Sequence, residues 1–158
     1  MTADLVASNA KYLQICIFKC ESDWAYAMQM KQHASTLSGG KANNVANDTL
    51  TRRTNANRLR AHFLKRFRKA SQAADKLLQL ATGAVDELSL VEIEGYKAQM
   101  DATFAMERND HESAINNFLT AKLIFSEIRS TQDTLEALIY TEKVNQLETF
   151  IRSCAASI

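Results

Sequence analysis

The spacing of apolar residues predicts helices rather than strands. In the first part of the chain, apolar side chains recur every three or four positions, which is the period of one helix face. The residues of this stripe are Leu13, Cys16, Ile17, Cys20, Trp24, Ala27 and Met28. The stripe predicts a first helix from about Asp4 to Ala34.

A polar stretch follows this helix. Residues 36–57 contain 12 Gly, Ser, Thr or Asn residues among 22 positions, and such residues favour turns and mobile segments over packed structure. We therefore expect 36–57 to be a polar surface loop that is mobile in its first half. The second helix should begin between Thr51 and Asn57 and end near Ala81, because Gly83 is well placed to stop it.

Three further helices complete the prediction. One runs from about Glu87 to Arg108, and the next begins after Asp110, a good N-cap residue, and ends near Arg129. Ser130 or Thr131 should cap a last helix that reaches about Phe150.

The short turns between the last three helices favour antiparallel neighbours. The third and fourth helices also match part of a tetratricopeptide repeat, at the small, aromatic and turn positions Ala102, Asp110, Ala114, Phe118 and Ala121. With no proline and four glycines among 158 residues, the chain lacks the turn residues that a multi-stranded fold needs. We predict one all-α domain over residues 1–158, a tetratricopeptide-like antiparallel bundle of about five helices.

Charge divides the chain into two halves. Residues 1–82 hold 13 Lys or Arg against 5 Asp or Glu, whereas residues 83–158 hold 6 against 13. The halves therefore carry net charges of +8 and −7, which together give the net charge of +1. Such asymmetry favours one face that meets a polyanion.

The positive charge is concentrated in the second predicted helix. No acidic residue lies between Asp48 and Asp75, although solvated helices usually interleave both signs. At 100° per residue, one face is apolar and carries Leu59, Phe63, Phe67, Ala70, Ala74 and Leu77. The opposite face carries Arg58, Lys65, Arg68, Lys69 and Lys76, and its flanks carry Arg60 and Arg66.

A row of cations about 27 Å long, at about 1.5 Å per residue, fits a nucleic-acid backbone better than a small ligand. The predicted contacts are Arg58, Arg60, Lys65, Arg66, Arg68, Lys69 and Lys76, together with Arg52 and Arg53 near the start of the helix. Two other interpretations remain open: a surface for an acidic protein partner, such as a peptide or helix gripped by a tetratricopeptide-like adaptor, and a merely solubilising face.

Other chemistry has little support in the sequence. No apolar run approaches the roughly 20 residues of a membrane span, and no catalytic, metal or cofactor site or small-molecule substrate is expected. Cys16 and Cys20 stand one helical turn apart, but without a further ligand nearby they are interpreted as buried thiols. Three cysteines, with Cys154 the third, cannot all pair and favour a reducing, intracellular location.

Four segments in order resemble the N-terminal RNA-binding domain of the 68-kilodalton subunit of eukaryotic signal recognition particle. They are SDWAYAMQMKQHA (22–34), RLRAHFLKRFRKASQAADKL (58–77), AINNFLTAKLIFSEI (114–128) and IRSCAAS (151–157). The resemblance implies a tetratricopeptide-like helical fold, no enzymatic activity and binding to the particle's RNA near its three-way junction. It implies a role in particle assembly for co-translational targeting to the endoplasmic reticulum, and a cytoplasmic location with a nucleolar assembly stage.

The resemblance also implies two regions that this chain does not display. The family's arginine-rich helix lies upstream of the matching segments, and its C-terminal region pairs with the 72-kilodalton subunit. We expect the chain to be a trimmed domain that lacks both.

Overall fold

The computed structural model describes residues 9, 11–39 and 46–158. Among these residues it contains α-helices and their connections but no strand. The helices are α2 (Tyr12–Gly39), α3 (Ala46–Ala81), α4 (Glu87–Glu107), α5 (His111–Thr131) and α6 (Thr134–Ala155). The predicted all-α bundle of about five helices is confirmed.

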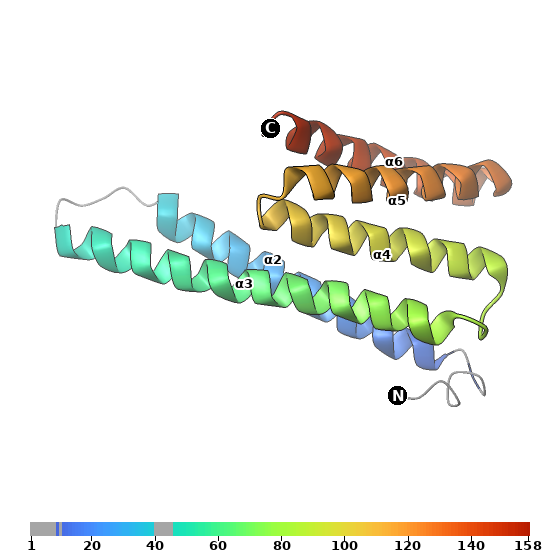
Figure 1. The fold of residues 1–158 in the computed structure, drawn as a ribbon, viewed down its shortest axis with the longest axis horizontal. Coiled ribbons are helices and arrows are strands. Elements are labelled where there is room, and N and C mark those ends of the chain that lie inside the picture. The colour runs from blue at the N-terminus through green and yellow to red at the C-terminus, as the bar shows by residue number, and fades with distance from the viewer. Residues whose placement is uncertain (1–8, 10, 40–45) are drawn as a thin grey trace.

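The helices run antiparallel to their neighbours in chain order (Figure 1). α2 and α3 form a long hairpin, and α4, α5 and α6 stack in sequence beside one end of it. α3 has 36 residues and α4 has 21, so at about 1.5 Å per residue they are about 54 and 31 Å long. The hairpin therefore projects beyond α4, and we call its projecting part, residues 31–39 and 46–60, the arm.

Apolar packing holds the two parts together. One buried cluster joins α4, α5 and α6 around Phe118, Phe125 and Leu147. Three smaller clusters follow one another along the α2–α3 seam, and α4 contributes Met100 and Phe104 to two of them. α4 therefore attaches the hairpin to the other two helices.

Local signals set several helix ends as predicted. Gly83 has a φ of 79° and ends α3, because glycine adopts this left-handed conformation without steric cost. Asn109 also has a positive φ, of 64°, and the amide of Asp110 donates to the carbonyl of Ala105 at 3.0 Å. Together with the hydrogen bond from the Asn109 amide to the Met106 carbonyl at 3.0 Å, this bond closes α4 in a Schellman-type turn. The Asp110 carboxylate then caps α5 through the Ser113 amide at 3.2 Å.

The predicted loop over 36–57 is wrong in its bounds. Residues 36–39 belong to α2 and residues 46–57 to α3, while 40–45 lie outside the described residues. Helix propagation is cooperative once a packed segment exists, and Phe63 and Phe67 anchor α3 against Ala34 of α2. A composition rich in Ser, Thr and Asn does not outweigh that anchoring.

Two helix starts also differ from the prediction. α2 begins at Tyr12, where the Asn9 side chain accepts from the Lys11 amide at 2.9 Å in a non-helical turn. Residues 4–8 of the predicted first helix lie outside the described residues. α6 begins after Asp133 and extends to Ala155, instead of being capped by Ser130 or Thr131 and ending near Phe150. The hydroxyls of Ser130 and Thr131 donate backwards to carbonyls of α5.

No described helix has the length and apolar content needed to cross a membrane. Within the same residues, no three side chains of the metal-ligating types come together. Cys16, Cys20 and Cys154 are buried, and none of them forms a disulfide among the described residues. Burial raises the pKa of the Cys20 thiol. Cys20 donates to the Ala70 carbonyl at 3.1 Å, so it contributes to α2–α3 packing as a protonated thiol.

Candidate nucleic-acid interface

α3 separates its apolar and cationic residues onto opposite faces, as the helical spacing predicts. Phe63, Phe67, Ala70, Ala74 and Leu77 are each at most 5% exposed. Arg58, Lys65, Arg68, Lys69 and Lys76 are all exposed, and we call these five residues the cationic stripe. The burial of the inner face fixes the rotation of α3 and so fixes the direction of the stripe.

The cationic stripe has no internal counter-charge. Within the described part of the chain, none of its five side chains makes an ion pair or a hydrogen bond. Arg53 is likewise exposed on the arm, whereas Arg52 is half-buried and makes an internal interaction. The stripe therefore presents its charge to solvent.

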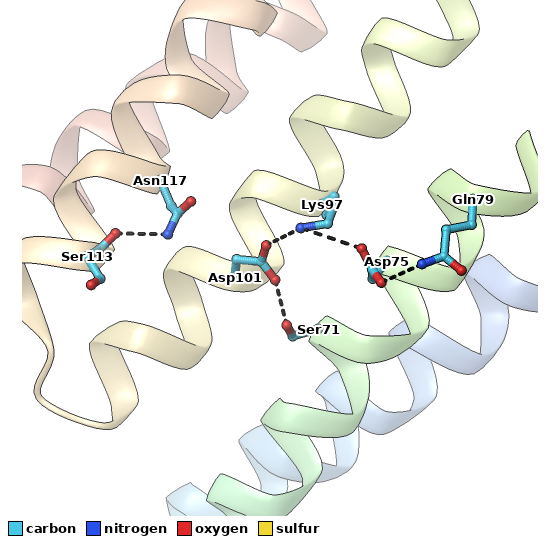
Figure 2. A network of polar contacts seen from close by, with 7 residues as sticks. All are labelled: Ser71, Asp75, Gln79, Lys97, Asp101, Ser113 and Asn117. Carbon is cyan, nitrogen blue, oxygen red and sulfur yellow. Dashed lines mark hydrogen bonds and ion pairs between the residues drawn. The ribbon is translucent and has the colours of Figure 1, made fainter. Parts of the chain in front are cut away.

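Two acidic residues at the α3–α4 seam share one lysine of α4. On the flank of α3 that faces α4, Lys97 lies 2.6 Å from Asp101 and 3.9 Å from Asp75 (Figure 2). The Ser71 hydroxyl donates to the same Asp101 carboxylate, and the Gln79 amide donates to Asp75 at 2.9 Å. This network links α3 to α4, and no residue of the cationic stripe takes part in it.

Arg66 lies on the other flank, where it faces α2. Its guanidinium donates to Asp23 at 2.9 Å and lies over the ring of Tyr26, 4.8 Å from the ring centre. The Asp23 side chain is only 8% exposed, and its second cation, Lys19, is 3.7 Å away. Arg66 is thus held in a defined position by a buried carboxylate and an aromatic face.

Arg60 lies on the α4 flank and reaches the end of that helix. It donates to the backbone carbonyl of Glu107 at 3.3 Å, and the Glu107 carboxylate accepts from Lys31 of α2. Of the predicted contact residues, the structure therefore brings five together on an open face. It ties Arg60 and Arg66 into the flanks and places Arg52 and Arg53 on the arm.

Sequence reasoning missed Asp23, Lys31 and Glu107. Asp23 stands in register with Cys16, Cys20 and Ala27 on the apolar stripe of α2. A carboxylate on a buried face needs a cationic partner, so its register was a usable signal. Glu107 stands in the last turn of α4, where the helix dipole disfavours negative charge, and that placement also demanded a cation.

The arrangement has a clear physical use. Five exposed cations span residues 58–76 of α3, about 27 Å at about 1.5 Å per residue. Each cation that meets a phosphate releases condensed counterions, so a row of this length favours a polyanion strongly at low salt. The inward direction of Phe63 and Phe67 means that this face has no aromatic platform for stacking bases, and it suits backbone contacts.

The chain is similar to known proteins in sequence and in fold. The family model described as "RNA-binding signal recognition particle 68" matches residues 1–158. The chain is 24% identical over 147 residues to signal recognition particle subunit SRP68 of Dictyostelium discoideum and 26% identical over 152 residues to that of Drosophila melanogaster. These matches cover 93% and 96% of the chain but 21% and 22% of the relatives, so it spans about a fifth of their length.

A solved structure, that of the SRP68-RBD from Chaetomium thermophilum, matches with a TM-score of 0.78 and 20% identity. The match covers 99% of this chain and 70% of that chain. At this identity the likeness establishes a shared fold.

Proposed function

The chain belongs to the RNA-binding signal recognition particle 68 family, and we propose that it binds the particle's RNA through the outer face of α3. The observation that carries this proposal is the cationic stripe, which is exposed and has no counter-charge among the described residues. A face held in this state is costly through like-charge repulsion unless a polyanion meets it.

Within this proposal, the RNA region is the neighbourhood of the three-way junction, and the domain is a non-catalytic scaffold for particle assembly. The role serves co-translational targeting to the endoplasmic reticulum, in the cytoplasm and with a nucleolar assembly stage. Pairing with the 72-kilodalton subunit would use a region outside these 158 residues. The support for these points is the family resemblance together with the curated relatives, of which the chain spans about a fifth.

The contact residues have two different roles. The cationic stripe meets phosphates directly, and Arg53 extends the contact along the arm. Arg66 and Arg60 border the face and are held by Asp23 and by the end of α4. Arginine can contact phosphate through two N–H groups at once, which favours geometric fit to a structured backbone over simple charge attraction.

The test replaces Arg58, Lys65, Arg68 and Lys69 together by glutamate. We expect binding to a three-way-junction RNA to be lost in fluorescence anisotropy at low salt, while helicity and melting change little. For the wild type, the logarithm of affinity should fall with the logarithm of salt concentration by about 0.7 to 0.9 per phosphate contact. A variant that retains partial affinity should show a smaller slope.

A matched control reverses two exposed cations elsewhere, Lys11→Glu and Arg152→Glu, and is compared with Lys65→Glu and Lys69→Glu. Both pairs change the net charge by the same amount. Because Arg152 also pairs with Glu148 at 3.2 Å, the melting temperature of each variant is measured beside its affinity. We expect the control pair to retain most of the affinity. An equal loss of RNA affinity in both pairs would show that binding depends on general charge attraction and not on a defined surface. Wild-type RNA affinity in the quadruple variant would remove the α3 face from the RNA interface. No RNA binding by the wild type at low salt would overturn the RNA proposal and leave an acidic peptide or helix as the ligand to examine.

A further inference from the structure

A polar pocket lies where the arm meets the C-terminal end of α4. Its volume is about 310 Å³, at the lower end of the roughly 300–1,000 Å³ typical of small-ligand sites. The side chains that matter for its chemistry are Lys31, Ser35, Asn57, Arg60, Phe63 and Glu107. They come from three helices, so the pocket exists only because the hairpin and α4 pack together.

Glu107 supplies hydrogen-bond acceptors to this pocket. Its side chain is 8% exposed, and Oε1 accepts from the Lys31 ammonium. A carboxylate has about four acceptor positions, and the hydrogen bond from Lys31 occupies one of them, on Oε1. The last turn of a helix disfavours negative charge, and the Lys31 ammonium offsets this cost at Glu107.

Donors surround this carboxylate. Arg60 uses one N–H group on the Glu107 carbonyl, and a guanidinium has five. Lys31 has three N–H groups, and one of them meets Glu107. The Asn57 side chain makes no hydrogen bond to any described residue. The pocket thus places an acceptor and several cationic or neutral donors around one small space that Phe63 also lines.

This combination of one carboxylate acceptor and several donors favours a ligand that has both donors and an acceptor. A phosphate dianion has no donor for the Glu107 carboxylate, whereas a base edge that carries both donors and an acceptor would use the whole set. Guanine presents adjacent N1–H and N2–H donors beside the O6 acceptor, and Arg or Lys is the usual partner of O6. Protein recognition of RNA sequence commonly takes unpaired bases by such edges, with Arg planes available for stacking.

We propose that this pocket binds one unpaired guanine of an RNA strand, a contact separate from the cationic stripe. The proposal rests on the RNA-binding function and adds base selection to it. Arg53 is exposed and stands seven residues before Arg60, about 10 Å along the same side of α3. It is therefore placed to meet a phosphate that flanks the bound guanine.

The test compares binding of the RNA pentamers UUGUU and UUAUU to this chain. We expect UUGUU to bind about tenfold more tightly, as a well-matched base contact discriminates by about 1–3 kcal/mol. Replacing the guanine by inosine, which lacks the N2 amino group, should remove much of the preference. Equal affinities for UUGUU and UUAUU, or no detectable binding of either, would overturn the pocket assignment.

Variants separate this pocket from the fold and from the stripe. Glu107→Gln and Asn57→Ala should each reduce the ratio of the two affinities, and the exposed Glu112→Gln control should leave it unchanged. If Glu107→Gln lowers the melting temperature but keeps the ratio, its role is structural and the proposal fails. The quadruple stripe variant should weaken both pentamers alike, so failure of the RNA-binding function is distinguishable. Guanosine monophosphate that competes as well as UUGUU would mark a free-nucleotide site and overturn the RNA assignment.

Discussion

The pair formed by Asp23 and Arg66 should respond asymmetrically to the loss of either partner. Truncation by Arg66→Ala leaves the Asp23 carboxylate, whose side chain is 8% exposed, with Lys19 as its remaining cation at 3.7 Å. Truncation by Asp23→Ala instead leaves the Arg66 side chain, which is 39% exposed, free to hydrate. The larger loss of stability is therefore expected when the buried carboxylate of Asp23 loses its partner.

The magnitude follows from burial. Breaking a fully buried ion pair from one side costs about 3–5 kcal/mol. Because water reaches Arg66, we expect about 2 kcal/mol for Arg66→Ala, including about 0.5 kcal/mol from the lost contact with the Tyr26 ring. Asp23→Ala should cost about 1 kcal/mol or less, since it also removes the desolvation penalty of the carboxylate. The double variant should cost little more than Asp23→Ala alone.

Urea denaturation followed by circular dichroism measures all three variants and gives the coupling free energy. In thermal melts, Arg66→Ala should lower Tm by about 4–8 °C for a chain of this size. Arg68→Ala is the matched control, because Arg68 makes no pair among the described residues, and it should stay within about 0.5 kcal/mol of wild type. The reasoning is refuted if Arg66→Ala costs no more than Asp23→Ala.

Three further predictions concern the helix framework. In Gly95→Ala the new Cβ would lie 2.9 Å from the Cγ2 atom of Ile124, so we expect a net loss of about 1–2 kcal/mol in urea denaturation as overpacking exceeds the gain in helix propensity. Gly83→Ala meets no atom within 4 Å, but its φ of 79° should cost about 1 kcal/mol by the same measurement. Hydrogen bonds from the side chain and amide of Ser113 lower the pKa of Asp110 below its ordinary 3.8. The stabilisation by Asp110 should therefore be complete above that value and disappear as pH falls through the lower folded pKa, so Asp110→Asn should flatten the acid limb of a stability–pH curve.

Periodicity and capping made much of the fold predictable. The two faces of α3, the stop at Gly83 and the start of α5 after Asp110 depend on residues within one or two turns of each other. The beginning of α3 was not predictable in the same way. Residues 46–57 are helical because they extend a segment anchored by Phe63 and Phe67, and local composition does not report that anchoring.

The site shows the same division between local and distant information. Exposure of the cationic stripe followed from helical geometry, and its contact with RNA stays a prediction. The pairing of Arg66 with Asp23 joins residues 43 positions apart, and that of Lys31 with Glu107 joins residues 76 positions apart. Charge counts reveal a surplus of cations but not which of them have internal partners.

The arm has a consequence for how the molecule opens. In its outer turns, the described residues of α2 and α3 pack only against each other. These turns can therefore separate without disturbing the cluster around Phe118 and Phe125. Amide exchange should consequently quicken from the α4 junction outward toward the free end of the hairpin. A ligand that bridges α2 and α3 there would oppose this opening. Amide exchange in the outer turns should therefore slow when the ligand binds.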